Sequence, residues 1–191
     1  AYLDIDQDGD DDIFVSTIWY EQPYLQKDIK RIPAEIYLNN GDGTYTYDMS
    51  MIDGEIPNFV HSRKAVVSDL NGDLRPDIFV ADHGYDASPF PGESPWLLLS
   101  NPDGSYSTQY LKNFIGFYHS ASAGDLDKDG DVDLFVTGFN LLILLNDGKG
   151  NFTDGTTQFS SQLSDIGRLN TSEIYDINLD GNLDIIAACE C

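Results

Sequence analysis

Oxygen-bearing side chains recur at a fixed spacing in four short segments of the chain. Each segment has Asp at positions 1, 5 and 9 and Asp or Asn at position 3, and the segments occupy residues 4–12, 69–77, 125–133 and 176–184. Ca²⁺ needs about six to eight oxygen ligands and tolerates irregular geometry, which a tight loop with alternating oxygens supplies. Mg²⁺ is the poorer candidate, because it prefers a strict octahedron and keeps several waters. The spacing therefore predicts up to four structural Ca²⁺ ions.

We expect each ion to be bound by the side chains at positions 1, 3, 5 and 9 and by the main-chain carbonyl at position 7. The predicted side-chain ligands are Asp4, Asp6, Asp8, Asp12, Asp69, Asn71, Asp73, Asp77, Asp125, Asp127, Asp129, Asp133, Asp176, Asn178, Asp180 and Asp184, and the predicted carbonyl ligands are Asp10, Arg75, Asp131 and Asn182. An Asp-rich turn without a cation is the weaker interpretation, because carboxylates a few ångströms apart repel one another strongly. Catalysis by these ions is not expected, because protein groups close the ligand set.

The loops are not EF-hands. An EF-hand carries a bidentate Glu at position 12 and is flanked by helices. Position 12 is instead Val15, Val80, Val136 or Ala187. Each loop also continues into a short apolar segment rich in β-formers, which places the metal loop between two strands.

The repeat that contains each loop has the length and strand content of a propeller blade. First strands are expected at 65–69 and 122–125, second strands at 13–15, 78–80, 134–136 and 185–187, and third strands at 35–39, 96–100 and 141–145. Gly-rich turns at 39–43, 101–104 and 146–150 lead into fourth strands at 44–47, 105–106 and 151–152. Gly, Asn and Asp supply the positive φ that such turns require.

With these loops, strands and turns the chain resembles the FG-GAP/VCBS repeat family, the calcium-loop blades also found in integrin α-subunit propellers and many secreted bacterial proteins. The resemblance implies an all-β fold, a β-propeller of four-stranded antiparallel blades with about three and a half blades present. Residues 1–191 would form a single propeller segment, a fragment of a larger propeller of the seven-bladed type. Leu74 replaces the usual Gly at position 6 of the second loop, so we expect that loop to be the most strained.

The two ends of the sequence raise the question of ring closure. The chain opens within a first strand and stops after a second strand, so it forms an open arc, completes a ring with a second copy, or belongs to a longer protein. Open blade edges favour self-association. Cys189 and Cys191 are separated by one residue, and a disulfide across one residue is strained, so an ordinary structural bridge is not expected. They could instead bind a metal, pair with a missing segment, or have no role.

Composition and charge limit the classes of partner that the chain can bind. The formal charge is −23, and the ten Lys and Arg residues form no cluster, which argues against nucleic acid as a partner. No stretch approaches the roughly 18 apolar residues of a membrane span. Loops of this kind fill at about millimolar calcium, which favours a secreted or cell-surface location.

The connections from second to third strands, and from each blade to the next, should lie on the face opposite the calcium loops. Long loops on a rigid scaffold commonly bind ligands, and aromatic side chains stack on sugar rings or anchor a protein partner. The candidate ligand-binding residues on this face are Trp19, Tyr20, Tyr24, His61, Arg63, His83, Tyr85, Phe90, Tyr118 and His119.

The function predicted from these features is a calcium-binding extracellular module for adhesion or for binding a glycan or protein ligand. One alternative is a polysaccharide-active lyase or hydrolase, with His and Arg side chains at the mouth of the central channel as general base and carboxylate clamp. No catalytic residues are assigned, because no Ser-His-Asp or paired-carboxylate arrangement is evident. The other alternative is a purely structural repeat of a larger surface protein.

Overall fold

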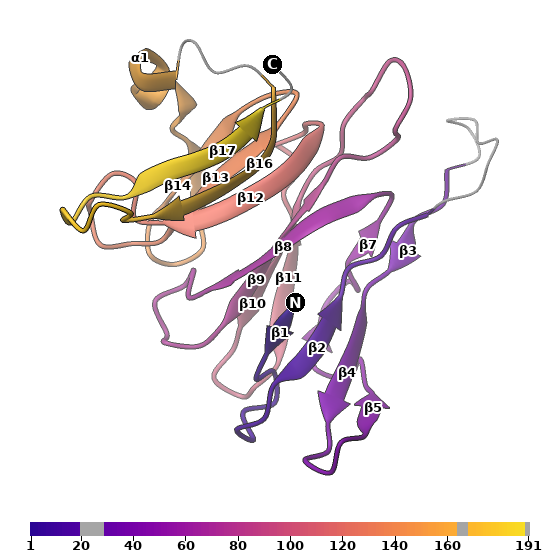
Figure 1. Cartoon of the computed structure of the whole chain (residues 1–191). Coiled ribbons are helices and arrows are strands. Elements are labelled where there is room, and N and C mark those ends of the chain that lie inside the picture. The colour runs from indigo at the N-terminus through magenta and orange to yellow at the C-terminus, as the bar shows by residue number, and fades with distance from the viewer. Residues whose placement is uncertain (20–28, 164–167, 190–191) are drawn as a thin grey trace.

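The computed structural model describes residues 1–19, 29–163 and 168–189. The described part of the chain is built almost entirely of antiparallel β-sheet, and the sheets fan out side by side along an open arc (Figure 1). Among the described residues no helix is long and apolar enough to cross a membrane. The all-β prediction is confirmed.

Three blades of four strands and one half-blade of two strands follow one another along the described part of the chain, and a fifth strand extends the sheet of the second blade. Blade 1 is β1 (Tyr2–Leu3), β2 (Asp12–Val15), β4 (Glu35–Asn39) and β5 (Tyr45–Tyr47); blade 2 is β8 (Ser62–Ser68), β9 (Asp77–Asp82), β10 (Trp96–Ser100) and β11 (Tyr106–Tyr110). Blade 3 is β12 (Tyr118–Gly124), β13 (Asp133–Gly138), β14 (Leu142–Asn146) and β15 (Phe152–Asp154), and half-blade 4 is β16 (Leu169–Tyr175) and β17 (Asp184–Cys189). Each neighbouring pair within a blade is antiparallel, as in a propeller.

A few elements lie outside this repeat. Strand β6 (Ile52–Asp53) pairs in parallel with β11 at the outer edge of blade 2, and β3 (Ile32–Pro33) pairs with β7 (Asn58–Phe59) in a short ribbon. A 3₁₀ turn, η2 (Thr156–Phe159), runs into the single-turn helix α1 (Ser160–Leu163). None of these elements was predicted, because runs of two to four residues carry no periodicity.

The core lies between the blades because successive strand residues face opposite sides of a sheet. In β9, Phe79 and Ala81 pack against blade 3, whereas Ile78 and Val80 pack against blade 1. All four are at most 1% exposed. A central blade is therefore apolar on both faces, which is why its second and third strands read as continuous hydrophobic runs.

The expectation that the cysteines form no ordinary structural bridge is wrong for Cys189. This residue, at the end of β17, is disulfide-bonded. Cys191 lies outside the described residues. Spacing alone therefore did not decide whether a Cys in this segment is bridged.

Candidate functional site

The four Asp-rich loops share one backbone conformation, which their own side chains hold. In each loop the position-1 carboxylate accepts a hydrogen bond from the amide at position 6, as Asp4 Oδ2 does from Gly9 N at 3.1 Å. The side chain at position 3 accepts from the amide at position 5, and the side chain at position 5 accepts from the amide at position 7. Asn71 and Asn178 make the position-3 bond as Asp does, so the turn needs an oxygen there rather than a charge.

Two positions of every loop have positive φ. They are Gln7, Gly72, Lys128 and Leu179 at position 4, and Gly9, Leu74, Gly130 and Gly181 at position 6. Leu74 has φ of 67° and is 93% exposed, so packing does not compensate for its left-handed conformation. Each loop nevertheless contains one glycine and one non-glycine residue at these two positions. The expectation that the second loop is the most strained is therefore not supported by the backbone.

In the three complete blades, the carboxylate at position 9 fastens the loop to the third strand of its blade. Asp77 Oδ2 accepts from Leu70 N at 2.7 Å, and its Oδ1 accepts from Ser100 N at 2.7 Å. Asp12 and Asp133 make the corresponding two contacts, and all three side chains are fully buried. A position-9 carboxylate thus holds its hairpin together whether or not it also contacts a cation.

In the first and third loops, carboxylate oxygens lie close together. One carboxylate oxygen from each of Asp4, Asp6 and Asp8 lies within 4.8 Å of the other two, and the same holds for Asp125, Asp127 and Asp133. Asp4 Oδ1 is buried and has no hydrogen-bond partner. Burial, followed by the charge of Asp12, raises the pKa of Asp6. A hard divalent cation fits this donor set, because it would neutralise the charge and satisfy the buried oxygen.

The loops lie on one face together with the Gly-rich turns. A Cβ at Gly41 would lie 3.1 Å from Asp10 Oδ2, and a Cβ at Gly148 would lie 2.5 Å from Asp131 Oδ1. Asp10 and Asp131 both occupy position 7, so turn and loop approach each other in the same way in blades 1 and 3. The predicted division of the connections between two faces is confirmed for these blades.

The opposite face carries a β-bulge that repeats in successive blades. The register of first against second strand shifts between Ser62 and Lys64 in blade 2, between Tyr118 and Ser120 in blade 3, and between Leu169 and Thr171 in half-blade 4. The residues inside the three shifts are Arg63, His119 and Asn170. Because β12 contacts both β8 and β16, the bulges lie on neighbouring first strands, and His119 Nδ1 lies 3.1 Å from Asn170 Oδ1.

His119 therefore lies within a strand. The sequence placed it just before the first strand of its blade, whereas β12 already begins at Tyr118. His61 does precede its strand, β8, as predicted. The bulges themselves were not predicted, because an extra strand residue leaves no signal in a single sequence.

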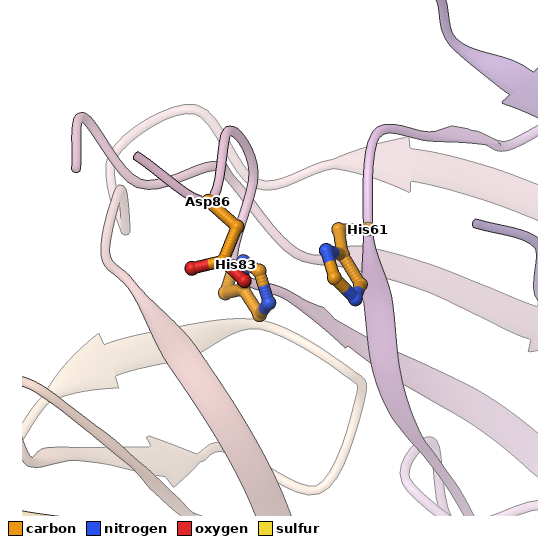
Figure 2. Close-up of side chains that lie close together, drawn as sticks. All are labelled: His61, His83 and Asp86. Atoms are coloured by element: carbon orange, nitrogen blue, oxygen red, sulfur yellow. The ribbon is translucent and has the colours of Figure 1, made fainter. Parts of the chain in front are cut away.

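Beside the bulges, His61, His83 and Asp86 lie close together (Figure 2). One possible ligand atom from each residue is within 4.8 Å of those of the other two. His61 and His83 are 8% and 1% exposed, whereas Asp86 is exposed. Burial lowers the pKa of His61 to about 4 and that of His83 to about 3, so both imidazoles are neutral at pH 7.

A buried carboxylate positions the two histidines. Asp82 accepts hydrogen bonds from the amides of Val60 at 2.9 Å, His61 at 2.9 Å and Gly84 at 2.8 Å. Burial raises its pKa to about 6 against the opposing effect of these donors. No sequence pattern distinguishes Asp82, since a lone Asp at a strand end is typical of turns.

Other predicted ligand residues lie near this cluster. Trp19 is half-buried, and its amide donates to the carbonyl of Val60 at 2.9 Å. Tyr85 is buried at 8% exposure, and Phe90 is 39% exposed. The ring of Phe90 lies 5.3 Å from that of Phe117, centroid to centroid.

Tyr118 belongs to the core rather than to the ligand face. It is 3% exposed, packs between blades 2 and 3, and donates its hydroxyl to the carbonyl of Phe114 at 3.1 Å. Strand alternation turns Tyr118 into the core, while its neighbour His119, at the bulge, is partly exposed. Tyr20 and Tyr24 lie outside the described residues.

Two hollows open beside the loops that leave the second strands of blades 2 and 3. One of about 490 Å³ is lined by Ile29, Arg31, Val60, Tyr85, Pro91, Gly92 and Glu93. The other, of about 290 Å³, is lined by Thr137, Gly138, Phe139, Asn140, Leu141, Arg168 and Leu169. In the second hollow the Arg168 guanidinium carbon lies 4.1 Å from the centroid of the Phe139 ring. Both hollows combine an aromatic ring with an arginine, a mixture suited to polar ligands.

Comparison with protein families identifies one family. The family described as FG-GAP-like repeat matches residues 4–80 and 69–136, in two overlapping copies. No curated protein matches the chain. The structure continues the same blade pattern through β15 and into β16 and β17. The described residues form a propeller-type repeat module, and the chain belongs to the FG-GAP-like repeat family.

Proposed function

We propose that this chain is a calcium-stabilised extracellular module that binds a glycan or protein ligand on the face opposite its calcium loops. The observation that carries the proposal is the repeated bulge, which puts Arg63, His119 and Asn170 at equivalent positions of three successive blades. A repeat that serves only to stack blades has no need to turn polar side chains out of its first strands.

Calcium in this proposal is structural. The position-1 to position-5 side chains would hold the ion, while the position-9 carboxylate holds the hairpin. The orphaned Asp4 Oδ1 and the raised pKa of Asp6 support a bound cation in the first loop. Membership of the FG-GAP-like family, together with the millimolar calcium found outside cells, favours an extracellular setting.

Thermal unfolding with and without calcium tests this role. If each site has a dissociation constant of about 10 μM, calcium at about 1 mM adds about 2.7 kcal/mol per site by mass action. We expect the melting temperature to rise strongly with Ca²⁺, hardly with Mg²⁺, and to fall again in EDTA. An Asp6→Asn/Asp8→Asn variant should lose part of the rise, and equal melting curves in Ca²⁺ and EDTA would refute the proposal.

The ligand face needs a separate test, because it lies on the other side of the blades. A glycan array and a panel of extracellular proteins should be probed with the calcium-loaded chain and with Arg63→Ala and His119→Ala variants. Both positions are at bulges on the surface, so the fold should survive. Gln7→Ala, on the calcium face, is the matched control. Binding that all three variants retain equally would place the ligand elsewhere.

Self-association is a second proposal, favoured by the uncovered face of half-blade 4. Ile186 in β17 is 55% exposed, and among the described residues β17 pairs on one side only, with β16. Such a strand recruits another edge. Sedimentation velocity should show association that grows with concentration and that Ile186→Lys weakens; a monomer at all concentrations argues against it.

A further inference from the structure

We infer that His61, His83 and Asp86 form a binding site for a divalent transition-metal ion of the zinc type, separate from the calcium loops. The three residues belong to blade 2, where His61 immediately precedes β8 and His83 immediately follows β9. Asp86 lies in the connection after β9 (Figure 2). The calcium loop of the same blade joins the other ends of these two strands, so the two sites lie on opposite faces.

The donor set distinguishes this ion from calcium. Calcium binds through oxygen, whereas imidazole nitrogens suit zinc, copper, iron and nickel. Two imidazoles and one carboxylate are a frequent ligand set for such metals and leave a further position for water or a ligand. The structure therefore favours a nitrogen-preferring cation at this site.

The hydrogen bonding of His83 selects its ligand atom. His83 Nδ1 lies 3.1 Å from the carbonyl oxygen of Gly84, which can only accept a hydrogen bond. Nδ1 therefore carries the proton, and Nε2 keeps a free lone pair. A backbone carbonyl on the second ring nitrogen is the usual partner of a metal-bound histidine, because it fixes the tautomer and the ring orientation.

The scaffold holds the two imidazoles close together. Their ring centroids are 3.9 Å apart, and the His83 ring stacks on Phe117 at 4.3 Å. Asp82 fixes the backbone of both strand ends through the amides of His61 and Gly84. Ligand atoms about 2.0–2.2 Å from a shared zinc ion lie within about 4.4 Å of one another. The possible ligand atoms of His61, His83 and Asp86 all lie within 4.8 Å of one another, which is close to that limit.

Arg63 tunes the site. Its Nη1 lies 3.4 Å from His61 Nε2, a long contact that places a positive charge next to the metal position. A cation there repels a metal ion and competes for the same nitrogen. Removing this charge should strengthen metal binding, whereas removing a ligand should weaken it.

The test is titration of the calcium-saturated chain with Zn²⁺ by calorimetry and with Co²⁺ by visible absorption. Excess calcium occupies the acidic loops and leaves the histidine site as the nitrogen donor. We expect one equivalent of zinc that calcium does not displace, with a shift of the His83 Nε2 resonance in long-range ¹H–¹⁵N spectra.

Substitutions distinguish the residues that bind the metal from residues that only lie nearby. Asp86→Asn changes an exposed residue and leaves the core intact, and we expect it to weaken zinc binding about 10-fold or more; His61→Gln should do the same. Arg63→Gln should tighten binding severalfold. His119→Gln is the matched control, because its ring lies 5.5 Å from that of His83 but it is outside the set of three. Its zinc affinity should match that of the unaltered chain.

Three results would overturn the inference. The first is the absence of stoichiometric zinc binding in calcium buffer. The second is zinc that excess calcium displaces, which would assign it to the acidic loops. The third is an affinity unchanged in both Asp86→Asn and His61→Gln while their calcium-dependent melting is normal.

Discussion

Blade 3 and half-blade 4 carry the same repeat, yet equivalent residues have different surroundings. Phe135 in β13 and Ile186 in β17 both stand two residues after the position-9 Asp. Phe135 is completely buried, because half-blade 4 covers it, whereas Ile186 is 55% exposed. The repeat thus specifies which residue faces the next blade, and the neighbouring blade decides whether burial follows.

The position-9 carboxylates differ in the same way. Asp133 is fully buried and binds the amides of Leu126 at 2.8 Å and Asn146 at 2.9 Å. Asp184 accepts from Ile177 N at 3.1 Å, and among the described residues its sheet has no third strand to supply a second donor. A complete blade therefore turns a loop residue into a buried link between strands.

The largest difference is expected for the apolar pair. Phe135→Ala removes a buried ring and should lower the free energy of unfolding by about 3–5 kcal/mol. Ile186→Ala changes an exposed side chain, so its effect should stay within about 0.5 kcal/mol. Urea unfolding of both variants in EDTA measures the contrast without a contribution from calcium. A large loss from Ile186→Ala would mean that another surface covers this residue in solution.

A somewhat smaller contrast is expected for the carboxylate pair. Asp133→Ala leaves two amides without an acceptor, at about 1–3 kcal/mol for each group that stays buried, so we expect a loss of about 2–4 kcal/mol. Asp184→Ala should cost less than about 1 kcal/mol, because the amide of Ile177 can turn to water. Urea unfolding of both variants in EDTA measures this contrast. Equal losses of unfolding free energy in Asp133→Ala and Asp184→Ala would show that the hydrogen bond to the third strand does not contribute to stability.

The face that carries His61 and His83 provides a pH-dependent contrast with the face that carries the Asp-rich loops. His61 and His83 have lowered pKa values in the fold, so they contribute stability above pH 6.5 that is lost as the pH falls toward about 4 and 3. Asp82 acts in the opposite sense, because its raised pKa of about 6 adds stability as the pH falls below that value. We expect acidification from pH 7 to pH 4 in EDTA to destabilise His83→Phe less than the unaltered chain. His119→Phe is the control. If the free energy of unfolding depends on pH in the same way in His83→Phe and in the unaltered chain, His83 does not contribute to the pH dependence.

The sequence predicted those features that repeat. The third strands at 35–39 and 96–100 coincide with β4 and β10, because turn glycines and β-branched or leucine-rich runs mark both ends. The blade order followed from four loops in phase. Local sequence was sufficient for both, because the residues that specify each loop and each strand lie within the loop or strand itself.

The second face depends on contacts that no local pattern encodes. Asp82 is 21 residues from His61, and His119 is 51 residues from Asn170, so only the completed blades bring them together. The inward orientation of Tyr118 and the outward orientation of His119 depend on a bulge of one residue. A single sequence contains no record of such a register shift.

The smallest expected effect concerns the strain within the loops. Leu74→Gly relieves a left-handed residue and should raise the free energy of unfolding by about 1 kcal/mol, less the entropy that glycine loses on folding. Gln7→Gly changes the other left-handed position, in the first loop, where φ is 64°. Because every loop has one non-glycine residue in this conformation, the two gains should be similar. Urea unfolding in EDTA compares them, and a gain confined to Leu74→Gly would restore the second loop as the most strained of the four.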